Sequence, residues 1–331
     1  MRLEPISLRN PVPLDVQPPV LTAATPTGLH LFARESTGGR TGRCMVNAQA
    51  ASGGAGHLSL SMVSGAAPCN GVLVVAGASV GRAPVIMGLS DAGDERWSAD
   101  VDPKGELGAW PIPVCARGRV ALVWWTKPAT LHVAQVEGRT ARAAGSLDCG
   151  DAIDGLEAAT SDDTVAAVVA TARALVLVTF ADGAVTNRVP VAAGRTAAPG
   201  ICALGGGLLV TWMTASNKEL RLRRFAGPTA QVEPDQAIVR ADQGESLRSL
   251  RLLGAYRDQV ALTWTLSQGG RRGDLTMQQF AAVYDATTGT LGPAQDLGPG
   301  GIFVAGGWIG DALVVIHGAD APLASAFRLI A

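Results

Sequence analysis

The chain has 331 residues, of which 47% are apolar and 17% are charged, with 27 Lys and Arg against 28 Asp and Glu. This composition is typical of a globular protein with a substantial core, and the balanced charge gives no overall field that would draw the chain to nucleic acid or to an anionic membrane. We therefore expect no nucleic-acid partner and no membrane partner. No segment approaches the ~18 uncharged apolar residues of a membrane helix, and we expect a cytoplasmic location, although a secretion signal could have been removed.

A turn followed by a short apolar run recurs seven times along the chain. The spacing between the first apolar residues of successive runs is 43 to 53 residues. These anchor residues are Leu29, Val72, Val120, Val165, Leu208, Val260 and Leu313. Periods of roughly 40 to 50 residues with several short strands each are typical of β-propeller blades. We therefore predict an all-β, seven-bladed β-propeller of four-stranded antiparallel blades, formed by residues 1–331 as a single domain.

The two ends of the chain together have the length of one repeat. The length of the segment up to Leu29 and the length of the segment after Leu313 add up to the length of one blade. A closed ring requires this, because the two ends must then share one blade. We expect a strand near Leu3 to pair with the C-terminal strand "LASAFRLI", which begins at Leu323, and so to complete the seventh blade.

Within each repeat, the strand before the anchor is predicted to line the central channel. These strands are short and rich in small residues, as in "LEAAT" at 156–160, and the last of them is predicted at "IFVAGGW", 302–308. The strand after the anchor alternates in "ELRLRRF", from Glu219, where Leu220 and Arg221 face opposite sides, as in a half-buried strand.

A large ring recurs four residues after the anchor. Tryptophan takes this position at Trp124, Trp212 and Trp264, and His317 takes it in the last repeat. One interpretation is that these rings fill the space between neighbouring sheets, because aromatic side chains bury much area. The other is that they surround a mouth and stack on a ligand.

Two turns resemble those of known propeller families. The segment "YDATTGTL", from Tyr284, resembles the turn of pyrroloquinoline-quinone-type propellers. The segment "SDAGDERW" is similar to the Asp box of sialidase-like propellers, although Asp91 and Gly93 lie one place early and Arg96 replaces Thr. The resemblance implies the propeller superfamily over the whole chain and no particular family within it.

Few residues capable of acid–base chemistry fall on the predicted channel strands. Besides cysteines, they carry Glu157, Arg248 and Arg251, which do not make the pair of carboxylates that a glycosidase needs. Cys69, Cys115 and Cys202 precede their anchors and are predicted to be small core residues, with a nucleophilic thiol as the alternative. The five cysteines are odd in number, so at least one is unpaired within the chain.

The connection "LDCGDAID" places three carboxylates at Asp148, Asp151 and Asp154. Calcium loops alternate their ligands more tightly. We therefore predict a solvated acidic loop, with these residues only as a weak candidate for a metal site, and we predict no cofactor.

The best remaining candidate for function is one rim, formed by the connections between blades and by the turns after the anchor strands. Loops on a rigid scaffold often carry binding residues, and aromatic residues and arginine are enriched at interfaces. The predicted binding residues are Arg40, Trp125, Lys127, Trp212, Trp264, Arg271, Arg272 and His317.

The leading hypothesis is a non-catalytic recognition or scaffold propeller that binds a peptide, a protein or a small molecule at this rim and in the central funnel. One alternative is a glycan-processing or natural-product-tailoring enzyme that uses rim carboxylates or a thiol. A second alternative is a structural subunit of a larger assembly.

Overall fold

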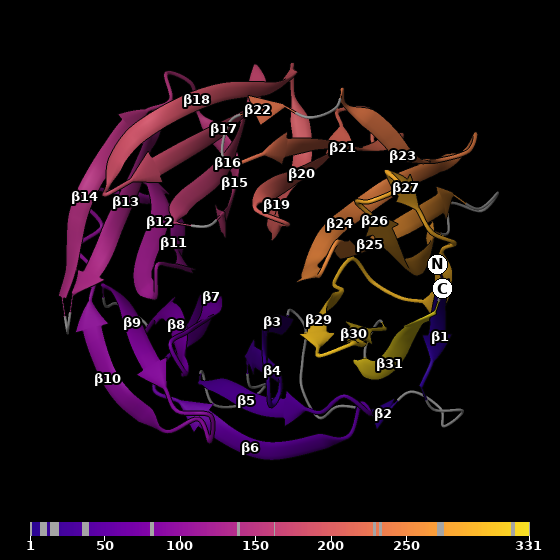
Figure 1. Ribbon diagram of the computed structural model, residues 1–331, viewed down its shortest axis with the longest axis horizontal. Coiled ribbons are helices and arrows are strands. Elements are labelled where there is room, and N and C mark those ends of the chain that lie inside the picture. The colour runs from indigo at the N-terminus through magenta and orange to yellow at the C-terminus, as the bar shows by residue number, and fades with distance from the viewer. Residues whose placement is uncertain are drawn as a thin grey trace. The chain divides into compact units, whose positions relative to one another are not determined.

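The computed structural model is all-β, with no helix in the residues that it describes (Figure 1). Its strands form seven antiparallel sheets. Two compact units contain them, one of Met1–Leu58, Ser216–Leu222 and Gln236–Ala331, the other of Ser59–Ala215 and Arg223–Asp235. The described residues are 2–6, 12–13, 20–34, 40–79, 83–137, 140–161, 163–227, 230–231, 234–269, 275–318 and 322–330.

The first, sixth and seventh sheets lie in the first unit. The first sheet consists of β3 (Val20–Thr25), β4 (Gly28–Arg34), β5 (Thr41–Val46) and β6 (Ser52–Leu58). The sixth consists of β24 (Glu245–Tyr256), β25 (Gln259–Gly269) and β26 (Leu275–Asp285), with β27 (Thr290–Leu291) and β28 (Gln295–Pro299) both beside β26. The seventh consists of β29 (Ala305–Ile309), β30 (Ala312–His317) and β31 (Leu323–Ile330), with β1 (Arg2–Pro5) and β2 (Val12–Pro13) both beside β31.

The second, third and fourth sheets lie in the second unit. The second sheet consists of β7 (Met62–Cys69), β8 (Val72–Ala78), β9 (Pro84–Leu89) and β10 (Glu95–Asp100). The third consists of β11 (Leu107–Ala116), β12 (Arg119–Thr126), β13 (Thr130–Glu137) and β14 (Thr140–Asp148). The fourth consists of β15 (Ile153–Ser161), β16 (Thr164–Thr171), β17 (Ala174–Ala181) and β18 (Ala184–Ala193).

The fifth sheet has its fourth strand in two pieces. Its strand order is β19 (Thr196–Leu204), β20 (Gly207–Thr214), β21 (Glu219–Ala226) and β22 (Ala230–Gln231), with β23 (Gln236–Arg240) also paired to β21. The outer position of the sixth and seventh sheets is likewise shared by two short strands. The fifth, sixth and seventh sheets therefore count five strands, although each is a four-stranded sheet whose outer strand is divided in two.

The N-terminal strand completes the last sheet, as the sequence predicts. β1 pairs antiparallel with β31, and Leu3 lies opposite Leu329. Each predicted anchor is the first or second residue of the second strand of its sheet, from Leu29 in β4 to Leu313 in β30. Seven antiparallel sheets in chain order, with the first strand entering the last sheet, define a seven-bladed β-propeller, so the predicted fold class is confirmed.

The core lies in apolar layers between neighbouring sheets. Trp124 shares one such layer with Ile86 of the second sheet, and its indole nitrogen donates to the Pro103 carbonyl at 3.0 Å. Trp212 shares another with Val168 of the fourth sheet. These two rings are almost fully buried, which confirms the interpretation that they fill the space between sheets.

First strands of neighbouring sheets pack against one another, and small residues permit their close approach. A Cβ atom added to Gly65 in β7 would lie 2.6 Å from Pro113 Cδ in β11, which is inside the contact distance of two carbon atoms. In the first unit, a Cβ atom added to Gly307 in β29 would lie 3.1 Å from the Cβ of Ala24 in β3. The small-residue content of the predicted channel strands thus follows from packing.

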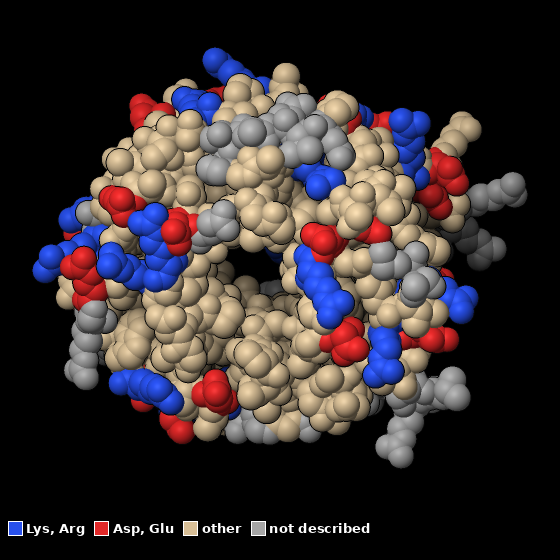
Figure 2. All heavy atoms as spheres, viewed as in Figure 1, with Lys and Arg blue, Asp and Glu red and all other residues tan. Residues whose placement is uncertain are grey.

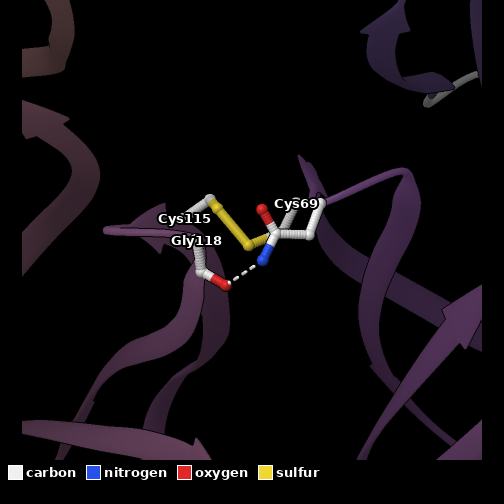
Figure 3. Close-up of a disulfide and its surroundings, with 4 residues drawn as sticks. Cys69, Cys115 and Gly118 are labelled. Carbon is white, nitrogen blue, oxygen red and sulfur yellow. Dashed lines mark hydrogen bonds between the residues drawn. A yellow bond between two sulfur atoms is a disulfide. The ribbon is translucent and has the colours of Figure 1, made fainter.

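A disulfide joins two of these first strands. Cys69 at the end of β7 is bonded to Cys115 near the end of β11, with their Cα atoms 5.4 Å apart (Figure 3). Beside it, the side-chain amide of Asn70 donates to the Gly118 carbonyl at 2.6 Å (Figure 3). The sequence predicts Cys69 and Cys115 as small core residues and leaves open whether any cysteines pair. The close approach of neighbouring first strands brings these two sulfur atoms within bonding distance.

We expect the double variant Cys69→Ala, Cys115→Ala to lose about 2–4 kcal/mol in free energy of unfolding, because the disulfide restricts the unfolded chain. Urea denaturation without reductant measures this loss. Wild type in reductant is the control, and it should unfold at the same urea concentration as the double variant. Equal stability of wild type and double variant without reductant would contradict the expectation.

Candidate functional site

Connections between sheets and the turns that follow second strands meet at one edge, as predicted for the rim. In the first unit, the Gly301 amide in the connection before β29 donates to the carbonyl of Gly318, which follows β30, at 3.3 Å. In the second unit, the Lys127 amide after β12 donates to the Glu106 carbonyl before β11 at 2.8 Å. The rim is therefore a set of loops that brace each other.

A buried glutamine holds the rim loop at 300–304. Gln279 of β26 is fully buried, and its side-chain NH2 donates to the carbonyls of Gly301 at 2.7 Å and Phe303 at 3.3 Å. Its side-chain carbonyl accepts from the Gly318 amide at 2.8 Å. One side chain thus ties the loop to the turn after β30.

Further hydrogen bonds join this loop to the sixth sheet. The Gly300 amide donates to the Met277 carbonyl at 3.1 Å, and the Thr265 hydroxyl donates to the Gly301 carbonyl at 3.3 Å. The loop comes so close that a Cβ atom added to Gly300 would lie 2.1 Å from Gln279 Oε1. Glycine at this position therefore permits the contact with the buried amide.

This braced loop presents two apolar side chains to solvent. Ile302 is 45% exposed and Phe303 is 46% exposed. Phe303 also forms part of a pocket whose wall is mostly apolar. The other lining residues are Val20, Val304, Ala305, Ile316, His317, Gly318 and Pro322. We call Ile302, Phe303 and this pocket the Phe303 surface.

The sequence prediction placed Ile302 and Phe303 within the first strand of the seventh sheet, and this boundary is wrong. β29 begins only at Ala305. The physical reason is that Gln279 binds the carbonyls of Gly301 and Phe303, so this backbone does not enter the ladder. The apolar pattern of this segment is that of a strand. The sequence offers no local signal that the side chain of the distant Gln279 binds the backbone carbonyl groups of the segment.

His317, one of the predicted binding residues, lines the same pocket. Its Nε2 atom lies 2.8 Å from the Ser325 hydroxyl, and the side chain is nearly fully buried. Burial lowers the pKa of His317 to about 4, because the charged imidazolium would lose its hydration. At neutral pH this histidine is therefore an uncharged part of the pocket wall.

The other predicted binding residues differ in accessibility. Trp125 is partly exposed and its ring packs on the backbone of Gly108, while Lys127 is ion-paired to Glu106 at 2.5 Å. Trp212 is 2% exposed and Trp264 is 4% exposed. A ligand could stack on these two rings only after they move, so their role in binding stays a prediction.

Trp264 stacks on Phe280 of the adjacent strand, with ring centroids 5.7 Å apart. Arg40 is exposed directly before β5. Arg271 and Arg272 lie in 270–274, outside the described residues, so their part in binding also stays a prediction.

The three carboxylates of the acidic connection are engaged separately. Asp148 accepts from the Gly150 amide at 2.8 Å, Asp151 is ion-paired to Arg173 at 3.6 Å, and Asp154 is ion-paired to Arg195 at 3.5 Å. Within the described ranges, no three His, Cys, Asp or Glu side chains are grouped as metal ligands.

Charges of both signs are mixed over the surface. Figure 2 shows Lys and Arg side chains beside Asp and Glu side chains on the face in view, with uncharged atoms between them. Exposed ion pairs such as Arg117 with Asp163, at 2.9 Å, and Arg328 with Asp311, at 3.8 Å, illustrate this pattern. Recognition at such a surface depends more on local contacts than on a field of one sign.

No protein family and no curated protein matches the sequence. Solved propellers nevertheless match almost the whole fold. BBS1N in its complex with ARL6DN is 11% identical, with a TM-score of 0.56, over 99% of this chain and 95% of the other. The Dos1 propeller is 9% identical, with a TM-score of 0.54, over 99% and 98%. A chain of the mitotic checkpoint complex is 12% identical, with a TM-score of 0.55, over 99% and 95%.

These TM-scores and coverages show a shared fold, and the class of protein is a β-propeller. The described part of the chain contains no helix that is long and apolar enough to cross a membrane.

The buried His317 should make stability depend on pH. An unfolded chain binds the proton near pH 6.5 and the folded chain only near pH 4, so the stabilisation is complete above pH 6.5 and is lost as the pH falls toward 4. The expected loss is about 3 kcal/mol. It is measured as the free energy of unfolding at pH 7.5 and pH 4.5.

His317→Gln is the matched variant, because glutamine can still bond Ser325 but does not titrate. Its loss of stability between the two pH values should be smaller than that of wild type. An identical loss in both proteins would show that His317 does not contribute.

Proposed function

We propose that this chain is a recognition β-propeller that binds a peptide or protein partner through the Phe303 surface, with its 331 residues acting as one domain. The observation that carries the proposal is the exposed pair Ile302 and Phe303 on a loop held by the buried amide of Gln279. The partner should offer an apolar side chain that packs on the exposed faces of Ile302 and Phe303.

The energetic argument rests on rigidity. Binding energy at interfaces is concentrated in a few residues, often aromatic ones, that pack into pockets. A mobile loop would lose conformational entropy on binding, whereas a loop fixed beforehand avoids much of that cost. The backbone of 300–303 is already held by five hydrogen bonds, so an exposed phenylalanine there is suited to be an anchor.

The likeness to other propellers supports a role in protein complexes. Two of the similar structures are complexes, BBS1N with ARL6DN and the mitotic checkpoint complex. Both share only the fold with this chain. They therefore support the proposal that this chain binds another protein, and the identity of that partner must come from experiment.

The enzymatic alternative has weaker support in the described residues. Burial raises the pKa of the Cys202 thiol to about 12 and also raises that of Cys149, so both thiols are protonated and poorly nucleophilic at neutral pH.

The predicted cytoplasmic location stays a prediction. The disulfide between Cys69 and Cys115 argues against it, because disulfides persist in oxidising compartments and are rare in the reducing cytosol.

A peptide selection tests the proposal. Peptides selected from a random display library against the wild-type chain should share apolar side chains. Phe303→Ser should weaken a selected peptide about 30-fold, because an interface anchor contributes about 2 kcal/mol or more. Fluorescence anisotropy with labelled peptide measures the Kd.

Leu275→Ser is the matched control, since Leu275 is 52% exposed on β26 and lies outside the Phe303 surface. It should leave the Kd unchanged, and both variants should keep the wild-type unfolding midpoint. Peptides that bind Phe303→Ser as tightly as wild type would overturn the proposal.

A further inference from the structure

A second pocket lies in the second unit, between the third and fourth sheets at their rim. It has a volume of about 230 Å³ and is bounded by the connection after β14, by the turn after β16 and by strands β17 and β18. A cavity of about 150 Å³ is enough to hold benzene. The pocket is therefore large enough for a small organic molecule, and it is separate from the Phe303 surface, whose residues belong to the first unit.

The inner wall of this pocket is apolar. Val169 of β16 and Val176 and Val178 of β17 line it, and all three are buried. These side chains belong to the apolar layer between the third and fourth sheets. An apolar group that entered the pocket would therefore extend the core layer and leave water behind.

The mouth of the pocket carries two arginines and one aspartate. Arg173, in the turn after β16, is ion-paired through Nε to Asp151 Oδ2 at 3.6 Å. Arg188, on β18, donates from Nη2 to the Cys149 carbonyl at 3.3 Å. A guanidinium group has five N–H donors in a planar fork, so this bond leaves Arg188 with donors for a ligand.

The formal charge of the pocket lining is positive, because Arg173 and Arg188 outnumber Asp151. Burial raises the pKa of the Cys149 thiol, and among the charges around it Arg188 lowers this pKa more than Asp148 raises it. Asp151 compensates Arg173 directly, whereas the contact of Arg188 is with an uncharged carbonyl group. An anionic group at the mouth would therefore meet Arg188 as its main partner, and a bidentate contact with a carboxylate suits the guanidinium fork.

We propose that this pocket binds a small amphiphilic carboxylate, whose apolar body packs on Val169, Val176 and Val178 and whose carboxylate group is bound by Arg188. The apolar wall selects a ring or a branched chain, and the arginine selects the anion over a neutral or cationic isostere. This site is independent of the Phe303 surface, so either one can fail without the other.

Three probes of one shape test the proposal by isothermal titration calorimetry. Benzoate carries the carboxylate, benzamide is its neutral counterpart, and benzylamine carries a positive charge. Benzoate should bind at least about tenfold more tightly than benzamide, in line with a charge-assisted hydrogen bond worth about 1.4 kcal/mol or more. Benzylamine should bind more weakly than benzamide.

Variants assign the contacts. Arg188→Gln should remove the preference for benzoate over benzamide, and Val176→Phe should weaken both probes because it fills the pocket. Arg142→Gln is the matched control, because Arg142 is an exposed arginine on the neighbouring β14 and is ion-paired to Glu137 at 3.4 Å. It should leave all affinities unchanged.

Arg188 is an exposed side chain, so Arg188→Gln should keep the wild-type unfolding midpoint and remain informative even if Val176→Phe folds poorly. The proposal is overturned if benzylamine binds best, if the three probes bind equally, if benzoate binding survives Arg188→Gln, or if none of the probes binds wild type.

Discussion

The close packing of first strands from neighbouring sheets is the constraint on which the rest of the structure depends. Gly65 leaves no room for a Cβ atom against Pro113, and a Cβ atom at Gly307 would lie in tight contact with Ala24. At these positions a larger side chain would force the strands apart. Other positions of the first strands carry large side chains, such as Glu157 in β15 and Arg248 in β24. The packing therefore fixes the spacing of the first strands, and the loops at the ends of the sheets are where insertions and further large side chains are tolerated.

The loops at the ends of the sheets are suited to binding because side chains of the sheets fix the loop backbone. Gln279 ties the loop that carries Phe303 to the turn after β30, and so converts an exposed apolar residue into a fixed one. In the second unit, the disulfide between Cys69 and Cys115 and the bond from Asn70 to Gly118 fix the turns at the other ends of the first strands. In both units, contacts between segments distant in sequence set the geometry of short turns.

The fold could be predicted from the sequence because each blade has the same local sequence pattern and this pattern recurs seven times. Anchors such as Leu29 and Leu313 mark second strands through a turn followed by an apolar run, and the lengths of the two ends imply the pairing of β1 with β31. The site could be predicted only in part, because His317 lines the pocket of the Phe303 surface but Ile302 and Phe303 have the pattern of a buried strand. Their exposure depends on Gln279, which is more than 20 residues away. The disulfide was missed for the same reason, since only packing brings β7 and β11 together.

The free energy of unfolding of Gly65→Ala tests the packing constraint most directly. If first strands pack as closely as described, the added methyl group meets the rigid ring of Pro113, and the variant should lose about 1–3 kcal/mol relative to wild type. Gly53→Ala is the reference substitution, because a Cβ atom at Gly53 in β6 would meet nothing within 4 Å, and it should be neutral or slightly stabilising. Equal stability of the two variants would contradict the account, because β7 and β11 would then have room for a side chain at Gly65.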